Sequence, residues 1–146
     1  MLPGYDYDFE MTIRSDEEFS RSVKRELVEE FLEQLPGVRR NGDRAFALNS
    51  PLDRWMDIVV ESRRWDGKIG ERMEAGELVN CIFLRIPASV RGPEKERDYF
   101  VLAFDIADHF GWLLFDDTDS GCCRGREWLE RAFPTKQARR PWWKVW

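Results

Sequence analysis

Residues 5–14 read Tyr-Asp-Tyr-Asp-Phe-Glu-Met-Thr-Ile-Arg, and this stretch decides the fold that the sequence predicts. Hydrophobic and polar side chains alternate throughout it, which is the period of a β-strand with one buried face and one solvent-exposed face. Asp6, Asp8 and Glu10 share the polar face. The stretch therefore predicts an opening strand that covers a hydrophobic core and carries a row of carboxylates on its outer side.

A helix is predicted directly after this strand. Ser15 and Glu18 have the spacing of a capping box, in which a hydroxyl and a carboxylate bind the first free N–H groups of a helix. Hydrophobic residues then recur at every fourth position from Phe19 to Leu35, where Pro36-Gly37 ends the pattern. The spacing predicts an amphipathic helix over residues 16–35.

The middle of the chain has the pattern of a sheet. Asn41-Gly42 is a strong two-residue turn signal, which fits either a tight hairpin or a loop that enters a strand at 44–48. Residues 55–61 alternate like a strand with one buried face. Residues 78–86 are almost entirely apolar, which predicts a central strand buried on both faces.

The last third of the chain predicts a second helix and a short strand. Residues 94–110 are hydrophobic around much of a helix circumference, and Gly111 is a good C-terminal stop. Residues 112–115 read as a short buried strand, and a short helix is expected over 126–133. The order β-α-β-β-β-α-β predicts an α+β fold, with a mainly antiparallel sheet and two principal helices packed on one face.

The charge distribution separates a basic tail from an acidic body. We expect one domain over residues 1–146, with 135–146 as a basic, tryptophan-rich C-terminal tail. The tail carries +4, and subtracting it from the net charge of −5 leaves −9 on the rest of the chain. An acidic body repels nucleic acid and suits a basic protein partner.

The sequence predicts neither an export signal nor a membrane span. The first residues lack the basic and apolar regions of a signal peptide, and no apolar run has the length of a transmembrane helix. The three cysteines are odd in number and two of them are adjacent, which is not a disulfide framework. The expected compartment is the cytoplasm.

Candidate catalytic and metal sites are few. A nucleophilic site of Cys122 or Cys123 with His109 and Asp116 can be drawn, but no spacing brings these groups together. Asp116, Gly121 and Glu127 have the spacing of a calcium-binding loop, although Thr118 and Ser120 stand where that loop needs Asp or Asn. We expect no catalytic centre, no metal and no cofactor.

Three tryptophans close the chain, at Trp142, Trp143 and Trp146. Such residues either pack back onto the domain or form an interface with a partner. The sequence leaves both alternatives open, and it does not define the oligomeric state.

Two segments resemble a known family. Tyr5-Asp6-Tyr7-Asp8-Phe9 with the helix that follows, and the segment from Phe104 to Asp116, are similar to segments of small bacterial immunity proteins of polymorphic and contact-dependent toxin systems. The resemblance implies a cytoplasmic, non-enzymatic protein that binds a cognate toxin and blocks its active site. An acidic body would suit a nuclease toxin, whose substrate site is basic.

The leading hypothesis is therefore an immunity-type protein, and its expected contact residues are acidic: Asp6, Asp8, Glu10, Asp116, Asp117 and Asp119. Two alternatives come from other classes. One is a small enzyme or ligand-binding protein, which would need a pocket with convergent polar groups between sheet and helices. The other is an assembly subunit that uses the tryptophan-rich tail.

Overall fold

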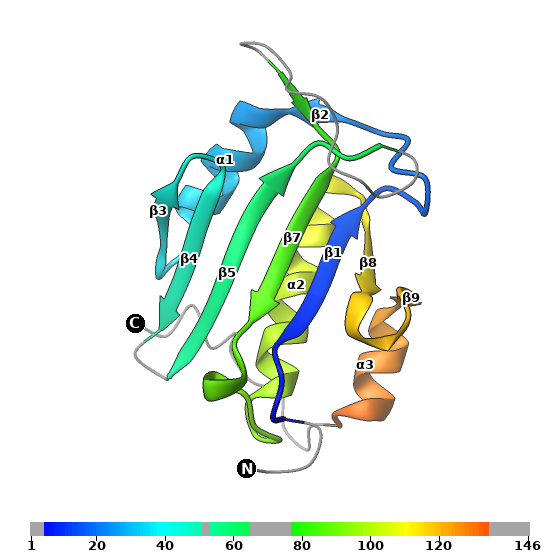
Figure 1. The fold of residues 1–146 in the computed structure, drawn as a ribbon. Coiled ribbons are helices and arrows are strands. Elements are labelled where there is room, and N and C mark those ends of the chain that lie inside the picture. The colour runs from blue at the N-terminus through cyan, green and yellow to red at the C-terminus, as the bar shows by residue number, and fades with distance from the viewer. Residues whose placement is uncertain (1–4, 51–52, 65–76, 135–146) are drawn as a thin grey trace.

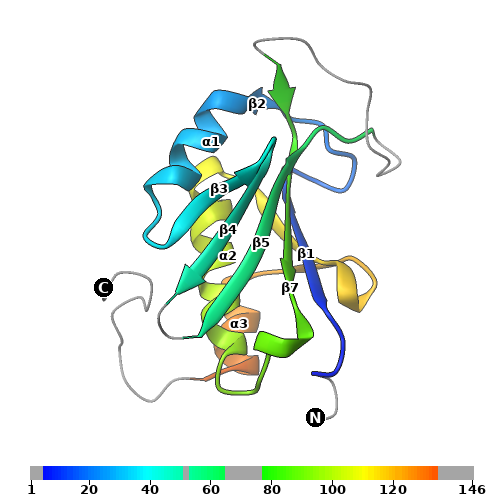
Figure 2. The ribbon, with the colours of Figure 1, turned by 60° about the vertical axis from the view of Figure 1, so that its left-hand side comes forward.

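The computed structural model describes residues 5–50, 53–64 and 77–134. In this part of the chain an antiparallel seven-stranded sheet, in the order β3-β4-β5-β7-β1-β8-β9, carries the helices on one face (Figures 1 and 2). The predicted α+β class, with a mainly antiparallel sheet and two principal helices, is confirmed. No helix among the described residues is long and apolar enough to cross a membrane.

The strands of the main sheet are β1 (Phe9–Arg14), β3 (Val38–Gly42), β4 (Ala45–Ser50), β5 (Arg54–Glu61), β7 (Cys81–Ile86), β8 (Leu113–Asp116) and β9 (Cys122–Arg124). A separate two-stranded ladder joins β2 (Val23–Lys24) to β6 (Leu78–Val79). The helices are α1 (Arg25–Gln34), α2 (Glu96–Phe110) and α3 (Arg126–Ala132), with short 3₁₀ turns η1 (Ala88–Val90) and η2 (Asp117–Asp119).

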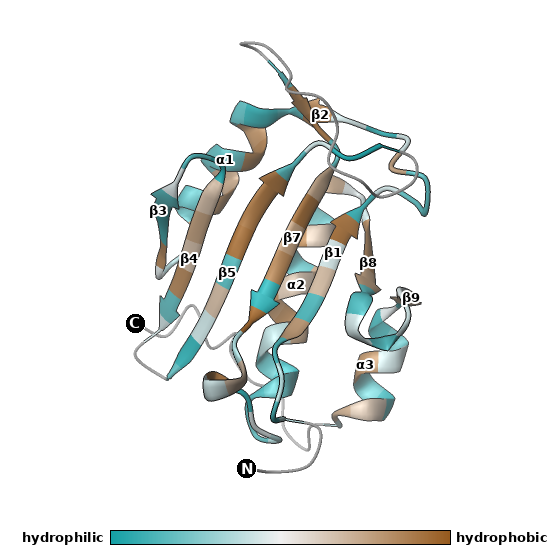
Figure 3. Cartoon of the chain, viewed as in Figure 1, coloured by the Kyte–Doolittle hydropathy of each residue, from teal (hydrophilic) through white to brown (hydrophobic). Residues whose placement is uncertain are grey.

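The core lies between the sheet and the helices. Alternate residues of the three central strands point toward α1 and α2, and their registers place Met11 opposite Leu84 and Leu84 opposite Ile58. All three are fully buried. Burial of one such side chain stabilises the fold by about 2 kcal/mol, so this layer is a main source of stability. Figure 3 shows hydrophobic residues running through β5 and β7.

The first helix is shorter than predicted, because the expected start at residue 16 was wrong. The Asp16 carboxylate accepts hydrogen bonds from the backbone N–H groups of Glu18 (2.9 Å) and Ser20 (3.1 Å), so it closes a turn rather than a helix. Phe19 has a φ of 58°, which a right-handed helix excludes. The chain then pairs with β6 before α1 begins at Arg25.

The buried face of α1 also differs from the expected one. Val28 and Leu32 are buried, whereas Leu27 is 54% exposed. A repeat of four residues advances by about 40° at each step around a helix with 3.6 residues per turn. The row of apolar residues therefore drifts off the core, and another pair of residues fills it.

The predicted strand 78–86 is interrupted at Asn80, which separates β6 from β7. The prediction that this strand is buried on both faces was also wrong, because Phe83 and Arg85 are partly exposed on the side away from the helices. The opening strand is shorter too and begins at Phe9.

The remaining strand and helix predictions agree with the structure within a few residues. A tight hairpin joins β3 to β4, but its turn is Asp43-Arg44 rather than Asn41-Gly42, because Gly42 pairs with Ala45. Gly111 ends α2 in the left-handed conformation, as expected. The predictions for Trp142, Trp143 and Trp146 lie outside the described residues.

Candidate functional site

No α-helix among the described residues covers the face of the sheet that points away from α1, α2 and α3 (Figure 1). Its register places Thr12 beside Phe83 and Val59 beside Phe83, so these side chains share that face. We define the open face by the side chains on this side of the three central strands, together with that of Asp8, which precedes β1: Asp8, Glu10, Thr12, Arg14, Trp55, Asp57, Val59, Glu61, Phe83 and Arg85. Aromatic and aliphatic groups therefore lie between charged ones. Thr12 is only 1% exposed, so the part of this face beside η2 is covered.

Ion pairs hold the charged side chains of the open face in place. The Arg85 guanidinium bridges two strands, with its Nε 2.9 Å from the Asp8 carboxylate and another nitrogen 3.0 Å from the Asp57 carboxylate. The backbone N–H of Ala88 donates to Asp8 over 3.0 Å. This hydrogen bond, together with Arg85, lowers the pKa of Asp8. The Asp8 carboxylate is thus charged at neutral pH, and Arg85 orients both it and the Asp57 carboxylate.

A second group of side chains joins β1 to η2. The Thr12 hydroxyl donates to the Asp117 carboxylate over 3.3 Å, and the backbone N–H of Glu10 donates to the Thr118 hydroxyl over 2.8 Å. Burial raises the pKa of Asp117, and the hydrogen bond from Thr12 partly offsets this rise. Arg14 lies over the ring of Phe115, with 3.9 Å between guanidinium carbon and ring centroid.

The six acidic residues predicted as contacts do not form one surface. Asp8 and Glu10 belong to the open face, and Asp117 lies at its edge through Thr12. Asp116 is only 4% exposed, on the opposite side of the sheet. Exposed Asp119 forms an ion pair with Arg124, and Asp6 is exposed ahead of β1.

Other members of the open face were missed by the sequence analysis. Trp55 and Asp57 lie there, and the indole Nε1 of Trp55 donates to the Asp57 carboxylate over 2.9 Å. The alternation of residues 55–61 was a usable signal for these two. Phe83 gave no such signal, because an uninterrupted apolar run hides which residues share a face.

The Asp116–Gly121 segment forms a hydrogen-bonded turn. The Asp116 carboxylate accepts from the backbone N–H of Asp119 (3.1 Å), and its carbonyl accepts from the N–H of Gly121 (2.9 Å). Among the residues that the structure describes, no group of three or more His, Cys, Asp and Glu side chains is placed to hold a metal ion.

The groups of the nucleophilic site considered from sequence have other contacts. The His109 ring stacks on Phe31 at the end of α2, with 3.9 Å between centroids. Cys122 and Cys123 are exposed on the edge strand β9. Cys81 is fully buried, and burial raises the pKa of its thiol to about 12. A thiol in that state is a core residue rather than a nucleophile.

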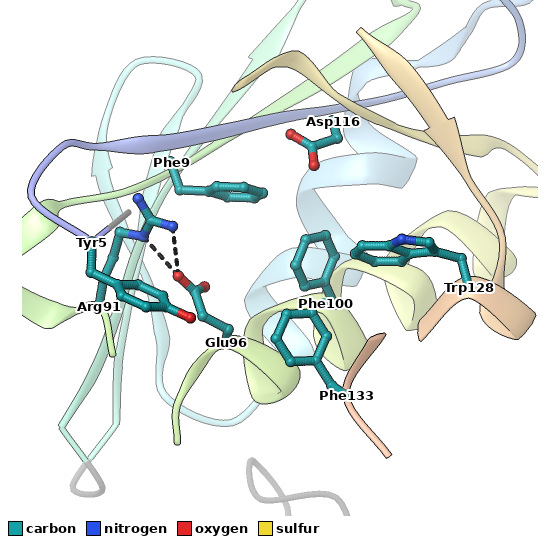
Figure 4. A pocket seen from close by; sticks show the side chains of 8 residues that line it. All are labelled: Tyr5, Phe9, Arg91, Glu96, Phe100, Asp116, Trp128 and Phe133. Carbon is teal, nitrogen blue, oxygen red and sulfur yellow. Dashed lines mark hydrogen bonds and ion pairs between the residues drawn. The ribbon is translucent and has the colours of Figure 1, made fainter. Parts of the chain in front are cut away.

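A pocket of about 230 Å³ lies on the other side of the sheet, among β1, α2 and α3. Its walls combine five aromatic rings with two carboxyl groups and one guanidinium (Figure 4): Tyr5, Phe9, Phe100, Trp128, Phe133, Glu96, Asp116 and Arg91. A pocket with polar groups between sheet and helices is the feature that the ligand-binding alternative requires.

Glu96 and Arg91 form a buried ion pair in this pocket. One Glu96 oxygen, Oε1, lies 2.8 Å from Nε of Arg91 and 2.7 Å from a terminal nitrogen of the same guanidinium. Burial raises the pKa of Glu96, while Arg91 acts in the opposite direction and Asp116 adds to the rise. Burial also raises the pKa of Asp116.

The described residues thus provide two surfaces of different chemistry. The open face is broad, and it alternates hydrophobic side chains with oriented charges. The pocket is small, aromatic and lined by two carboxyl groups. No protein-family model matches the chain, and none of the curated proteins compared with it matches its sequence.

Proposed function

We propose that this chain is a protein-binding module of the immunity type, which docks through its open face on a basic toxin domain and blocks the toxin's active site. The observation that carries the proposal is the one-sided sheet. Over the described residues the helices cover one face only, and the other face presents partly exposed Trp55, Val59 and Phe83 among charged groups.

The hydrophobic part of the open face has the composition of an interface centre. Large aromatic side chains surrounded by polar groups are typical of the residues that dominate protein–protein affinity. Trp55 is already oriented by its hydrogen bond to Asp57, so a partner would lose little free energy in ordering it.

The charges of the open face favour a basic partner. On this face and at its strand ends, the four carboxylates of Asp8, Glu10, Asp57 and Glu61 exceed the three guanidinium groups of Arg14, Arg63 and Arg85 by one. The chain as a whole carries −5. Complementary charge accelerates association and orients the two proteins, and a nuclease-type toxin would offer that charge at its substrate site.

The first test is capture of a partner by the tagged chain from its own cells at moderate salt. The proposal expects a single basic protein in stoichiometric amount, whose toxicity to cells is suppressed when the chain is co-expressed. A captured protein without such toxicity, or one whose toxicity the chain leaves unchanged, contradicts the proposal.

A pair of charge reversals then tests which surface binds. Glu10→Lys on the open face should lower the association rate about tenfold at low salt, with the difference shrinking as salt screens the charges. Glu30→Lys makes the same charge change at an exposed position of α1 and should bind like the parent chain. An equal fall in association rate in the two variants would exclude docking through the open face.

A further inference from the structure

The pocket between β1, α2 and α3 has aromatic walls arranged around Phe100. The Phe100 ring meets Phe9 edge-on (5.3 Å between centroids, 75° between planes) and Trp128 edge-on (4.8 Å, 70°), and it stacks with Phe133 (5.7 Å, 28°). These rings present π-electron faces and edges to the cavity, a setting that favours cationic or apolar groups.

One polar atom in this setting is left without a partner. Glu96 is 2% exposed, and its Oε2 has no hydrogen-bond partner among the described residues. Figure 4 shows this oxygen turned away from Arg91, on the side of Phe100 and Phe133. A buried carboxylate oxygen without a hydrogen-bond donor destabilises the folded state. A ligand that donates a hydrogen bond to Oε2 of Glu96 would therefore be stabilised in this pocket.

The surrounding charges indicate what kind of donor fits. Asp116, 4% exposed, places a second carboxyl group at the pocket. The Arg91 guanidinium is already engaged, because it binds Oε1 of Glu96 and donates to the backbone carbonyl of Tyr7 over 2.8 Å. It also lies 5.0 Å from the ring centroid of Phe9. Asp116 is paired with Arg124, whose terminal nitrogen lies 3.5 Å from its carboxylate. The carboxylate oxygen that lacks a partner is therefore Oε2 of Glu96, and a positively charged donor would bind it more strongly than a neutral one.

We infer that this pocket binds a primary ammonium group on a short apolar stem, which donates to Oε2 of Glu96 while its stem lies against Phe100, Trp128 and Phe133. The volume of about 230 Å³ limits the occupant to a small amine or one lysine side chain, since sites for drug-sized ligands start near ~300 Å³. This site lies on the helix side of the sheet, so the inference does not rest on docking through the open face.

The test is titration of the chain with n-butylammonium at neutral pH and low salt, followed by calorimetry and by ¹H–¹⁵N correlation spectra. The indole N–H signal of Trp128, assigned by its loss in Trp128→Phe, should shift on binding. Tetramethylammonium cannot donate a hydrogen bond and 1-butanol carries no charge. Both should therefore bind at least about tenfold more weakly than n-butylammonium. No heat and no indole shift with n-butylammonium, or equal binding of 1-butanol, overturns the inference.

Variants then connect the binding to Glu96. Glu96→Gln keeps an oxygen for Arg91 and removes the charge, and it should weaken n-butylammonium binding about tenfold. Glu29→Gln is the matched control, because Glu29 is a partly buried, arginine-paired carboxylate of α1 outside the pocket. Equal affinity in Glu96→Gln and the parent chain overturns the inference.

Two further measurements apply if Glu96→Gln does not fold. Phe133→Ala removes a ring from the pocket rim and should weaken binding, whereas Phe31→Ala removes a partly exposed ring elsewhere and should not. In the parent chain the affinity should fall as pH is lowered through the raised pKa of Glu96, because the proton and the ammonium compete for the same carboxylate. An affinity that Phe133→Ala and pH leave unchanged contradicts the inference.

The source of the ammonium group is distinguished with a second probe. Nα-acetyl-lysine amide presents a lysine side chain as a protein would. Binding at least as tight as that of n-butylammonium assigns the pocket to a lysine of a partner protein. Binding of n-butylammonium alone assigns it to a free small amine.

Discussion

Arg91 and Glu96 form a deeply buried ion pair, in which the side chains are only 5% and 3% exposed. Removing two charges from water is costly, and the mutual attraction of such a pair often does little more than offset that cost. The raised pKa of Glu96 shows this balance, because burial outweighs the effect of the adjacent guanidinium. The pair therefore specifies the shape of the pocket more than it stabilises the fold.

Removal of one partner should reveal that cost. Arg91→Met leaves the Glu96 carboxylate buried without its guanidinium, and we expect a loss of about 3–5 kcal/mol in the free energy of unfolding at neutral pH. Arg91 lowers the pKa of Glu96, so its removal should raise that pKa further, and the loss should shrink as pH falls from the variant's pKa towards the parent's, where the carboxyl group is protonated. Urea denaturation at several pH values measures both effects.

The control at the residue scale is an exposed ion pair. Arg126 is 46% exposed and pairs with Asp105 and Asp108, so Arg126→Met should cost less than about 1 kcal/mol. The interpretation of the buried pair would be wrong if the two arginine variants lost the same stability, or if the loss in Arg91→Met did not depend on pH.

At the scale of elements, Asn80 determines where β6 ends and β7 begins. Its amide nitrogen donates to the carbonyls of Phe19 (3.2 Å) and Arg63 (2.8 Å), and its oxygen accepts from the N–H of Arg63 (2.8 Å). One buried side chain thus joins three segments, including the turn that displaces the start of α1.

Asn80→Ala should therefore cost about 2 kcal/mol or more, because it leaves several buried backbone groups without partners. Asn49→Ala, at an exposed position of β4, should change stability by less than about 0.5 kcal/mol. Thermal and urea unfolding of the two variants measure the difference. Similar stabilities would show that water replaces the Asn80 hydrogen bonds.

Gly111 has a comparable role at the end of α2. Its φ is 66°, and a Cβ added there would meet no atom within 4 Å. Gly111→Ala should therefore cost about 1 kcal/mol from backbone strain alone, and Gly111→Asn should cost less because asparagine tolerates this conformation better. Gly42→Ala, where the added Cβ would lie 3.6 Å from Ala45, is the control without positive φ. Urea denaturation should show the largest loss of stability in Gly111→Ala and a smaller loss in Gly111→Asn. A Gly111→Ala variant as stable as the parent chain would contradict this prediction.

At the scale of the whole molecule, one hydrophobic cluster joins the central strands to α1, α2 and Leu129 of α3. A continuous core of this kind favours a single cooperative unfolding transition. Far-ultraviolet circular dichroism and tryptophan fluorescence should therefore report the same midpoint in urea.

Leu84→Ala tests this cooperativity at the centre of the sheet. Leu84 is fully buried between Met11 and Ile58, and its truncation should cost about 2–5 kcal/mol while both signals move together. Leu113→Ala, where the side chain is 46% exposed, should cost far less. Separate transitions for the two signals would show that sheet and helices unfold independently.

The two sides of the sheet differ in chemistry. The open face is the surface proposed to bind a protein, and the helix side holds the pocket proposed to bind an ammonium group. Carboxylates and partly exposed rings spread over the open face, whereas the helix side confines two carboxyl groups within a small aromatic pocket. Because the sheet separates them, a variant on one side should leave binding on the other unchanged.

Much of this fold follows from local patterns. The alternation in β1 and β5, the apolar length of α2 and the glycine after it each agree with the structure, because these signals depend on residues close together in the chain. The start of α1 did not follow from local pattern. Its capping signal at residues 15–18 was overridden by a buried Phe19 and by the bonds of Asn80, which come from a distant segment.

The sequence by itself determined the α+β class, the antiparallel central strands and the acidic character of the chain. Only the tertiary structure decided which acidic residues share a surface. Asp116 and Asp117 are adjacent in sequence, yet Asp116 lines the pocket on the helix side and Asp117 bonds to Thr12 at the open face. Asp116 ends β8 and Asp117 begins η2, so their side chains lie on opposite sides of the sheet, and the Thr12 hydroxyl that binds Asp117 comes from 105 residues away. A local sequence pattern cannot predict such partners, because strand register and helix packing bring them together only in the folded chain.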